Sequence, residues 1–166
     1  MEGSVQEKIT NTLKQKYEDE ILHIETPYDF LTITLKKEKI AEIIRYLYEN
    51  PDTRFQYLTS IGAVHYPELN QIAIVYQLHN LISNERLRLK TYLPSDNAVT
   101  DSITSIFLGA NWMERETYDF YGVNFKGHPN LKRILNVDDM IIFPMRKEYP
   151  LEDQTREDKN DALFGR

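Results

Sequence analysis

The chain has 166 residues, 41% of them hydrophobic and 11% aromatic, which suits one domain with a buried core and excludes a chain disordered throughout. Its formal net charge of −6 argues against nucleic-acid binding, which normally requires a basic excess. Cysteine is absent, which excludes disulfides and thiolate-bound metals, and no apolar run approaches the roughly 20 residues that cross a bilayer.

The N-terminal part of the chain predicts two helices and two short strands. Apolar residues spaced four apart, together with an S-x-x-E capping box, predict a helix over 4–17. Strands are expected over 21–25 and 28–35, and the second alternates so that one face is wholly apolar. The clearest helix covers about 37–50, because its isoleucines and leucine recur at i, i+3, i+4, i+7 and Pro51 follows.

Three longer strands follow, over about 55–65, 72–79 and 86–93. Hairpin-like connections join them, so an antiparallel meander is expected. A short helix is predicted near 99–108, ending at a glycine. These elements indicate an α+β fold, with helices packed on one face of a mixed, mainly antiparallel sheet.

The stretch "NWMERETYDFYG" predicts another helix, over about 112–121. Asn111 stands at the N-cap position with Glu114 three residues later, and Gly122 occupies the position after the last turn where a left-handed residue is favoured. The aromatic residues of this helix are interpreted as core or interface anchors.

The charges of this helix have two interpretations. Glu114 and Glu116 point to different sides, whereas Glu116 and Asp119 lie three apart and can meet, with Arg115 four residues before Asp119. A carboxylate pair beside an arginine is able to do acid–base chemistry. The spacing favours the alternative, an ion-paired helix face.

Beyond Gly122 the periodicity ends while the apolar content stays high, and three prolines interrupt regular structure. We therefore expect a domain over 1–122 and an extended, irregular C-terminal arm over 123–166. Apolar side chains in such an arm need a covering surface, so the arm is expected to dock on another protein of a complex. Its basic residues either dock an acidic partner or are simply solvated.

The sequence gives little support for a metal site, a nucleotide-binding site or a catalytic nucleophile. The four histidines, His23, His65, His79 and His128, have no companion at metal-ligand spacing, and no nucleotide-binding motif or nucleophile elbow occurs. Catalysis by this chain alone is therefore not expected.

The stretch "ERETYDFYGVNFKGHPNLKRIL" closely resembles the signature of the 30-kDa subunit of respiratory complex I, which in bacteria is NADH-quinone oxidoreductase. The matching positions are Glu114, Arg115, Glu116, Asp119, Phe120, Tyr121, His128, Lys132, Ile134 and Leu135. Downstream, "FPMRKEYPLE" (143–152) resembles a second family motif. Met140, Ile141 and Ile142 depart from the family, which commonly has a tryptophan and a glycine before that motif.

The resemblance implies a non-catalytic structural subunit of the complex that transfers electrons from NADH to quinone and translocates protons. It implies no cofactor bound by this chain, with NADH, FMN, iron–sulfur clusters and quinone elsewhere in the complex. The expected partners are the large subunit that helps to form the quinone site (the quinone-site subunit), together with neighbouring peripheral-arm subunits. The location expected is the cytoplasmic side of the inner membrane, with attachment to the membrane only through partners.

The same resemblance suggests roles for individual residues. Four residues are expected to fix the junction between helix and arm: Glu114, Arg115, Glu116 and Asp119. Four others are expected to lock the arm to the partner: His128, Arg133, Arg146 and Lys147. Gly122, Pro129 and Lys132 complete the expected docking set. Two alternatives stay open: the equivalent subunit of a related membrane-bound hydrogenase or plastoquinone-reducing complex, and a free-standing hydrolase using Glu116 and Asp119.

Overall fold

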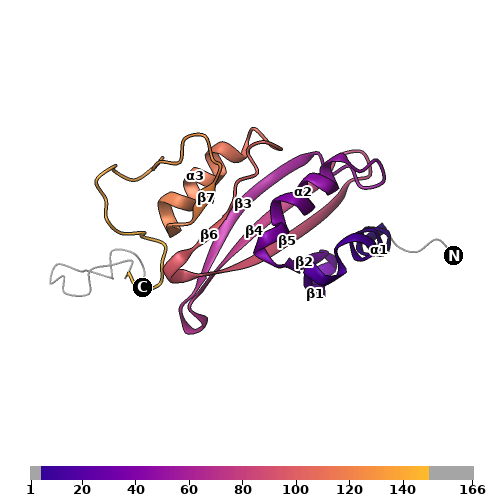
Figure 1. The fold of residues 1–166 in the computed structure, drawn as a ribbon, viewed down its shortest axis with the longest axis horizontal. Helices are drawn as coiled ribbons and strands as arrows, with labels where there is room; N and C mark the ends of the chain where they lie inside the picture. The colour runs from indigo at the N-terminus through magenta and orange to yellow at the C-terminus, as the bar shows by residue number, and fades with distance from the viewer. Residues whose placement is uncertain (1–4, 150–166) are drawn as a thin grey trace, which may run out of the picture.

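The computed structural model describes residues 5–149, and Figure 1 shows an elongated molecule with the arm and the β4–β5 hairpin at opposite ends. Its main elements are α1 (Val5–Tyr17), β1 (Ile21–Glu25), β2 (Thr32–Leu35), α2 (Ile40–Glu49), β3 (Tyr57–Tyr66), β4 (Gln71–Asn80), β5 (Glu85–Pro94), β6 (Val99–Asp101), α3 (Ala110–Tyr121) and β7 (Asn124–Lys126). Short 3₁₀ turns connect several of them. The predicted α+β class is confirmed.

Five strands form one mixed sheet in the order β1-β2-β5-β4-β3. The β2–β5 pair is parallel and the other three pairs are antiparallel. The predicted meander of three long strands is therefore confirmed as β3, β4 and β5. A second, two-stranded sheet joins β6 to β7 in parallel.

The core lies between the helices and one face of the sheet. The α2 residues Ile40, Ile43, Ile44 and Leu47 are fully buried, as their helical spacing predicts. Alternate residues of β4 and β5 face them, because side chains point to opposite faces along a strand. The α1 helix adds Ile9, Leu13 and Tyr17 to the same core. Its predicted capping residue, Ser4, lies outside the described residues.

Two local predictions are wrong. The strand expected over 28–35 begins only at Thr32, because Tyr28 and Asp29 adopt left-handed backbone angles that interrupt an extended chain. The helix expected over 99–108 does not form: residues 99–101 are β6, and an irregular loop follows. In that loop the Ser102 hydroxyl accepts the Thr104 N–H, a local bond that competes with helix formation.

The core continues a short way past Gly122. Val123 and Phe125 are 0% and 2% exposed and belong to the main hydrophobic cluster, because β7 pairs with β6. From Gly127 to Tyr149 the chain contains turns and bends but no helix or strand. These residues, 127–149, are called the arm below, and Figure 1 shows them looping past α3.

Within residues 5–149, no helix combines the length and the apolar character that crossing a membrane requires.

Candidate functional site

The base of the arm is built around α3. This helix begins at Ala110, slightly earlier than predicted, with Gly109 at the N-cap, so Asn111 is not the capping residue. It ends as predicted at Gly122, whose left-handed φ of 74° lets its N–H donate to the Tyr118 carbonyl at 2.8 Å. The helix end therefore turns the chain sharply into β7 and the arm.

The Asp119 carboxylate binds the arm from this helix. Its side chain is 0% exposed. Oδ2 accepts the consecutive backbone N–H groups of residues 134–136 at 3.1, 2.8 and 2.9 Å, and Oδ1 accepts Nη1 of Arg133 at 2.8 Å. Three successive N–H groups converging on one anion form a backbone nest. We call Asp119, Arg133 and residues 134–136 the clasp.

Burial raises the pKa of the Asp119 carboxyl, but the N–H groups of residues 134–136 and the Arg133 guanidinium outweigh it and hold the pKa well below its usual range. The carboxylate is therefore ionised throughout the physiological range. Its side chain is 0% exposed and accepts four hydrogen bonds from its own chain, so it is not accessible to a substrate as a general base.

Arg133 completes the clasp from the arm. Besides the Asp119 carboxylate, Nη1 donates to the Asp119 carbonyl at 2.9 Å, and Nη2 donates to the carbonyls of Met140 and Ile142. The guanidinium also lies 5.2 Å from the Phe143 ring centroid. Because its side chain is 7% exposed, Arg133 belongs to the helix–arm junction and does not face outward as the sequence suggested.

Two further arginines hold the arm through backbone carbonyls. Arg115 donates to the carbonyls of Lys132 and Arg133 at 3.1 and 2.8 Å, so the pair with Asp119 that its spacing allows is not formed. Arg146 donates to the Tyr121 carbonyl at 2.8 Å and packs against the Phe143 ring. Arg115 thus satisfies carbonyls of the irregular arm, and Arg146 satisfies a carbonyl at the C-terminal end of α3 that the helix itself leaves unpaired.

Glu114 fixes the other side of α3. It is 0% exposed; Oε1 accepts the Ile103 N–H at 2.8 Å and Oε2 accepts the Ser102 hydroxyl at 2.7 Å. Burial raises the pKa of the Glu114 carboxyl to about 7, although these two hydrogen bonds act to lower it. No cation is paired with it among residues 5–149. The carboxyl therefore ties the loop after β6 to α3.

Glu114 makes stability depend on pH. Its folded-state pKa lies above the ordinary value of 4.5, so the contribution of this carboxyl to stability is complete below pH 4.5 and falls as the pH rises towards 7. Between pH 4.5 and pH 7, the free energy of unfolding of wild type is expected to fall by about 3 kcal/mol more than that of Glu114→Gln, because each unit of pKa shift corresponds to about 1.4 kcal/mol. Urea unfolding at pH 4.5 and 8 measures this, with the exposed Glu116→Gln as control; parallel curves for wild type and E114Q would exclude it.

Gly122 is required by its conformation and by a neighbour. A Cβ at this position would lie 2.5 Å from Cε2 of Phe143, and φ is +74°. We expect Gly122→Ala to cost about 2–4 kcal/mol, from the left-handed backbone and the displaced ring. Gly127→Ala is the matched control, since φ there is +81° with open space around it. Thermal denaturation of both variants measures their loss of stability, and the difference gives the part caused by the clash with the Phe143 ring. Equal losses would mean that the ring contributes nothing.

Of the other residues expected at the site, one is hydrogen-bonded within the helix–arm junction and four are exposed to solvent. His128 is held inside the junction: its Nδ1 accepts the Asn130 N–H, so its Nε2 carries the proton donated to the Asn111 carbonyl, each at 3.0 Å. Four residues are exposed: Glu116, Pro129, Lys132 and Lys147. Glu116 is exposed whereas Asp119 is buried and bonded to the arm, so the carboxylate pair that their spacing allows does not form.

One contact was not foreseen from the sequence. His65, on β3 and only 5% exposed in its side chain, accepts the Lys147 N–H with Nδ1 at 3.0 Å, and Glu148 lies 3.4 Å away. This contact returns the far end of the arm to the sheet. No local pattern indicates it, because the two residues are 82 positions apart.

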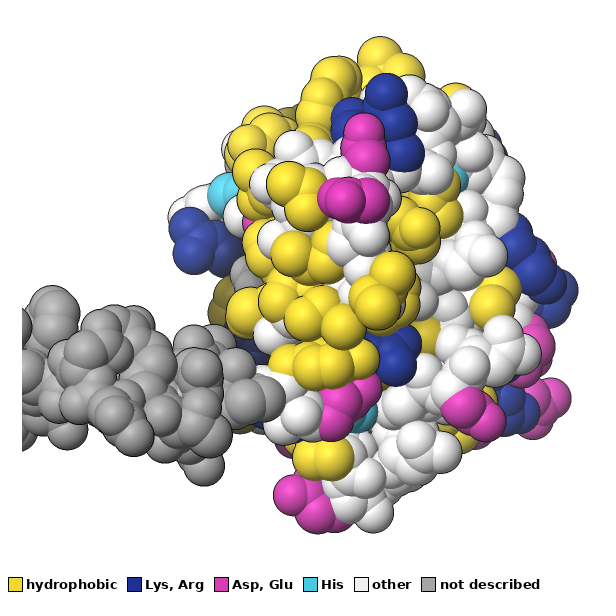
Figure 2. Space-filling view, turned by 90° about the vertical axis from the view of Figure 1, so that its left-hand side faces the viewer, with side chains coloured by type: hydrophobic (Ala, Val, Ile, Leu, Met, Phe, Trp, Pro, Cys, Tyr) yellow, Lys and Arg dark blue, Asp and Glu magenta, His cyan; other side chains and the backbone are white. Residues whose placement is uncertain are grey.

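An apolar surface covers this end of the molecule. The strongly exposed apolar side chains of the arm and α3 are Trp112 (56%), Leu135 (68%), Val137 (63%), Ile141 (92%) and Met145 (44%). We call these five residues the arm surface. Figure 2, which faces this end, shows hydrophobic side chains gathered into one broad area. Such an area is typical of a protein–protein contact.

Comparison with known proteins decides the family. The model of the respiratory-chain NADH dehydrogenase 30 kDa subunit matches residues 33–155. The chain belongs to this family. The corresponding NADH-quinone oxidoreductase subunit from Citrifermentans bemidjiense is 38% identical over 146 residues, 87% of this chain and 89% of the relative.

Solved structures agree with the family. A chain of the membrane-bound sulfane sulfur reductase, an archaeal respiratory membrane complex, has a TM-score of 0.74 at 25% identity, covering 87% of this chain and 85% of that one. The trypsin-resistant fragment (1–134) of Nqo5 has a TM-score of 0.64 at 25% identity, covering 76% of this chain and 99% of the fragment. Among the residues that hold α3 to its loop and arm are four from the motif that resembles the family signature: Glu114, Arg115, Asp119 and His128.

In residues 5–149, no group of three or more His, Asp or Glu side chains is placed so that it could hold a metal ion.

Proposed function

We propose that this chain is the structural 30-kDa subunit of an NADH-quinone oxidoreductase, in the peripheral arm on the cytoplasmic side of the membrane. It supports electron transfer from NADH to quinone, coupled to proton translocation, and reaches the membrane only through partners. The observation that carries the proposal is the arm: a clasp holds its base to α3 while its apolar side chains remain uncovered.

The arm surface supports docking on the quinone-site subunit. Ile141 and Leu135 are 92% and 68% exposed, although adjacent arm residues are tightly bonded to α3. Burying one such side chain contributes about 1.5–3 kcal/mol to association. The hydrogen bonds of the clasp hold the arm in place without a partner. A partner therefore meets a formed surface, and little conformational entropy is lost on binding.

The folded domain and the arm are best treated as two functional parts. The similar fragment of Nqo5 resists trypsin over residues 1–134. In this chain the domain carries the sheet and the core, which extend to β7, and the arm of residues 127–149 serves docking. Glu116, Lys132 and Lys147 are the exposed charged residues of the expected set, and we assign them to the rim of the contact.

Of two other functions, one has support from a solved structure. The likeness to a chain of an archaeal sulfane sulfur reductase supports the second candidate, an equivalent subunit of a related respiratory complex. Catalysis by Glu116 and Asp119 has no support, because Asp119 is buried and accepts four hydrogen bonds from Arg133 and residues 134–136, while Glu116 is exposed.

Purification of the tagged chain from native membranes tests the proposal. We expect the flavin- and NADH-binding subunits to co-purify with the quinone-site subunit, together with NADH:quinone activity. Recovery with nickel–iron hydrogenase or sulfur reductase subunits, and without an NADH-binding protein, would favour the second candidate. Recovery of the chain alone would contradict both.

A further inference from the structure

The face of the sheet turned away from the helices has an unusual distribution of charge. Residues of β4 and β5 that alternate with the core residues point to this face, and in β5 these include Arg86, Arg88 and Lys90. Lys90 is paired with Glu25 at 3.3 Å. Across residues 5–149, no carboxylate lies within ion-pair distance of Arg86 or Arg88. Although the chain's net charge is −6, this face presents the guanidiniums of Arg86 and Arg88, two residues apart on β5, without an ion-pair partner in residues 5–149.

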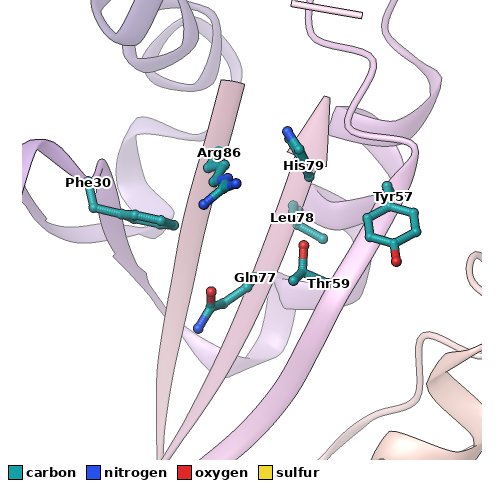
Figure 3. A pocket seen from close by; sticks show the side chains of 7 residues that line it. All are labelled: Phe30, Tyr57, Thr59, Gln77, Leu78, His79 and Arg86. Atoms are coloured by element: carbon teal, nitrogen blue, oxygen red, sulfur yellow. The ribbon is translucent and has the colours of Figure 1, made fainter. Parts of the chain in front are cut away.

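A pocket of about 160 Å³ adjoins these arginines at the hairpin end of the sheet. Its walls come from the long strands and the turn before β2: Phe30, Tyr57, Thr59, Gln77, Leu78, His79 and Arg86. Figure 3 shows Phe30 and Arg86 on one side of it and Tyr57 on the other. A cavity of about 150 Å³ holds one benzene-sized group, so this pocket has room for one side chain.

The pocket walls are already fixed in place. The Arg88 guanidinium stacks 4.5 Å from the centroid of the Phe30 ring, and the Tyr57 and His79 rings meet edge-on at 6.4 Å. His79 Nε2 is hydrogen-bonded to the Asn84 side chain at 3.1 Å. Backbone pairing sets Arg86 opposite His79. An occupant would therefore meet a formed site.

Exposed apolar side chains continue beyond the pocket. Leu81 and Ile82, in the turn between β4 and β5, are 66% and 77% exposed. Tyr28 is fully exposed two residues before Phe30, in the left-handed turn. Strained, exposed turns of this kind occur at contact sites. We call Phe30, Tyr57, His79, Arg86 and Arg88 the hairpin surface, with Tyr28, Leu81 and Ile82 at its margin.

We propose that the hairpin surface is a second docking site, which binds an acidic peptide segment of a neighbouring protein in the complex. A carboxylate of that segment binds the Arg86 and Arg88 guanidiniums, and one apolar side chain fills the pocket. This inference rests on the proposed function, since it requires a multisubunit complex. The surface is distinct from the arm surface, which lies at the other end of the molecule (Figure 1).

The charge pattern favours an acidic protein segment over other occupants. Guanidinium forks match carboxylates in geometry and are common at protein interfaces. A second copy of this chain related by twofold symmetry would bring like charges together. An anionic membrane normally needs about four to eight basic residues in a cluster, and here only two are unpaired among residues 5–149 of this face.

A zero-length crosslink tests the chemistry in the intact complex. Arg86→Lys keeps the charge and supplies an amine that carbodiimide joins to a carboxylate within contact distance. We expect the substituted position to crosslink to an aspartate or glutamate of another protein in the complex. The Lys90–Glu25 pair, 3.3 Å apart, serves as the internal control for the reaction. Formation of that control crosslink alone would overturn the proposal.

Charge reversal tests the contribution to assembly. We expect Arg86→Glu/Arg88→Glu to lower retention in the complex after a high-salt wash about tenfold, with an unchanged melting temperature of the isolated chain. The matched control is Lys8→Glu/Lys14→Glu, an equal charge change at exposed positions of α1. Equal retention of both variants, with NADH:quinone activity intact, would overturn this inference alone. Failure of wild type to join any complex would instead overturn the proposed function.

Sedimentation with phosphatidylglycerol vesicles tests whether the hairpin surface binds an anionic membrane instead of a protein. We expect the isolated wild-type chain to stay in the supernatant. Vesicle binding that Arg86→Glu/Arg88→Glu abolishes would assign the surface to lipid and contradict a protein partner.

Discussion

Asp119→Asn is expected to release the arm and to cost about 3–5 kcal/mol of stability, the loss typical of leaving one member of a buried ion pair alone. An amide has one acceptor oxygen, so its NH₂ group must face either the three N–H groups of residues 134–136 or the Arg133 guanidinium. Urea unfolding gives the loss, and limited trypsin digestion should show faster cleavage at Lys132 and Arg133.

The control for this variant is Asp138→Asn, which makes the same chemical change at an exposed position of the arm. It is expected to change stability by no more than about 0.5 kcal/mol. Because the pKa of Asp119 is lowered in the fold, its contribution is present above the ordinary value of 3.8 and is lost as the pH falls below it. Similar stability and similar digestion of the two variants would show that the clasp does not hold the arm.

Ile141→Asp is expected to lower incorporation into the complex at least tenfold while leaving the isolated chain as stable as wild type. Ile141 is 92% exposed, so the aspartate is solvated in the free chain. In the complex the aspartate would be buried without a partner. Burying an unpaired carboxylate costs more than about 1.4 kcal/mol, the free energy that corresponds to a tenfold loss of affinity. Membrane purification followed by quantification of this chain relative to the quinone-site subunit measures the effect.

Leu22→Asp provides the comparison, as it introduces the same charge at a leucine of β1 that is 57% exposed. Wild-type incorporation of this variant would show that the effect of Ile141→Asp is local. Wild-type incorporation of Ile141→Asp itself would mean that the arm surface is not a contact with the complex.

The sequence predicted regular elements well where periodicity was strong. The α2 helix and the β3–β5 meander follow directly from the spacing of residues such as Ile40, Ile44 and Leu89. Residues 99–108 were misassigned because their apolar spacing resembles a helix, while side-chain bonds from Ser102 and Glu114 stabilise a loop there. Those bonds depend on tertiary structure, which local sequence does not report.

The sequence predicted which residues belong to the candidate site better than it predicted which of them bind one another. Asp119 was expected to meet Arg115 or Glu116 by helical spacing, but it binds Arg133, fourteen residues away. Irregular chain has no period, so its hydrogen-bond partners cannot be read from spacing. For the same reason the contact of His65 with the arm was missed.

The signature residues of the family acquire a physical meaning from this arrangement. Glu114 ties the preceding loop to α3, Arg115 and Asp119 tie the following arm to it, and Gly122 makes the turn between them. Together they hold irregular chain in one conformation on a regular scaffold. The hydrogen bonds of these side chains thus join the loop after β6, α3 and the arm.

Hydrogen–deuterium exchange, compared between the isolated chain and the assembled complex, tests the account most directly. Protection of the amides of residues 134–136 is expected in both samples, because the Asp119 carboxylate binds them without any partner. Protection of residues 137–145 should rise strongly only in the complex, where a neighbouring protein covers the arm surface. Equal exchange of residues 137–145 in the two samples would contradict the account.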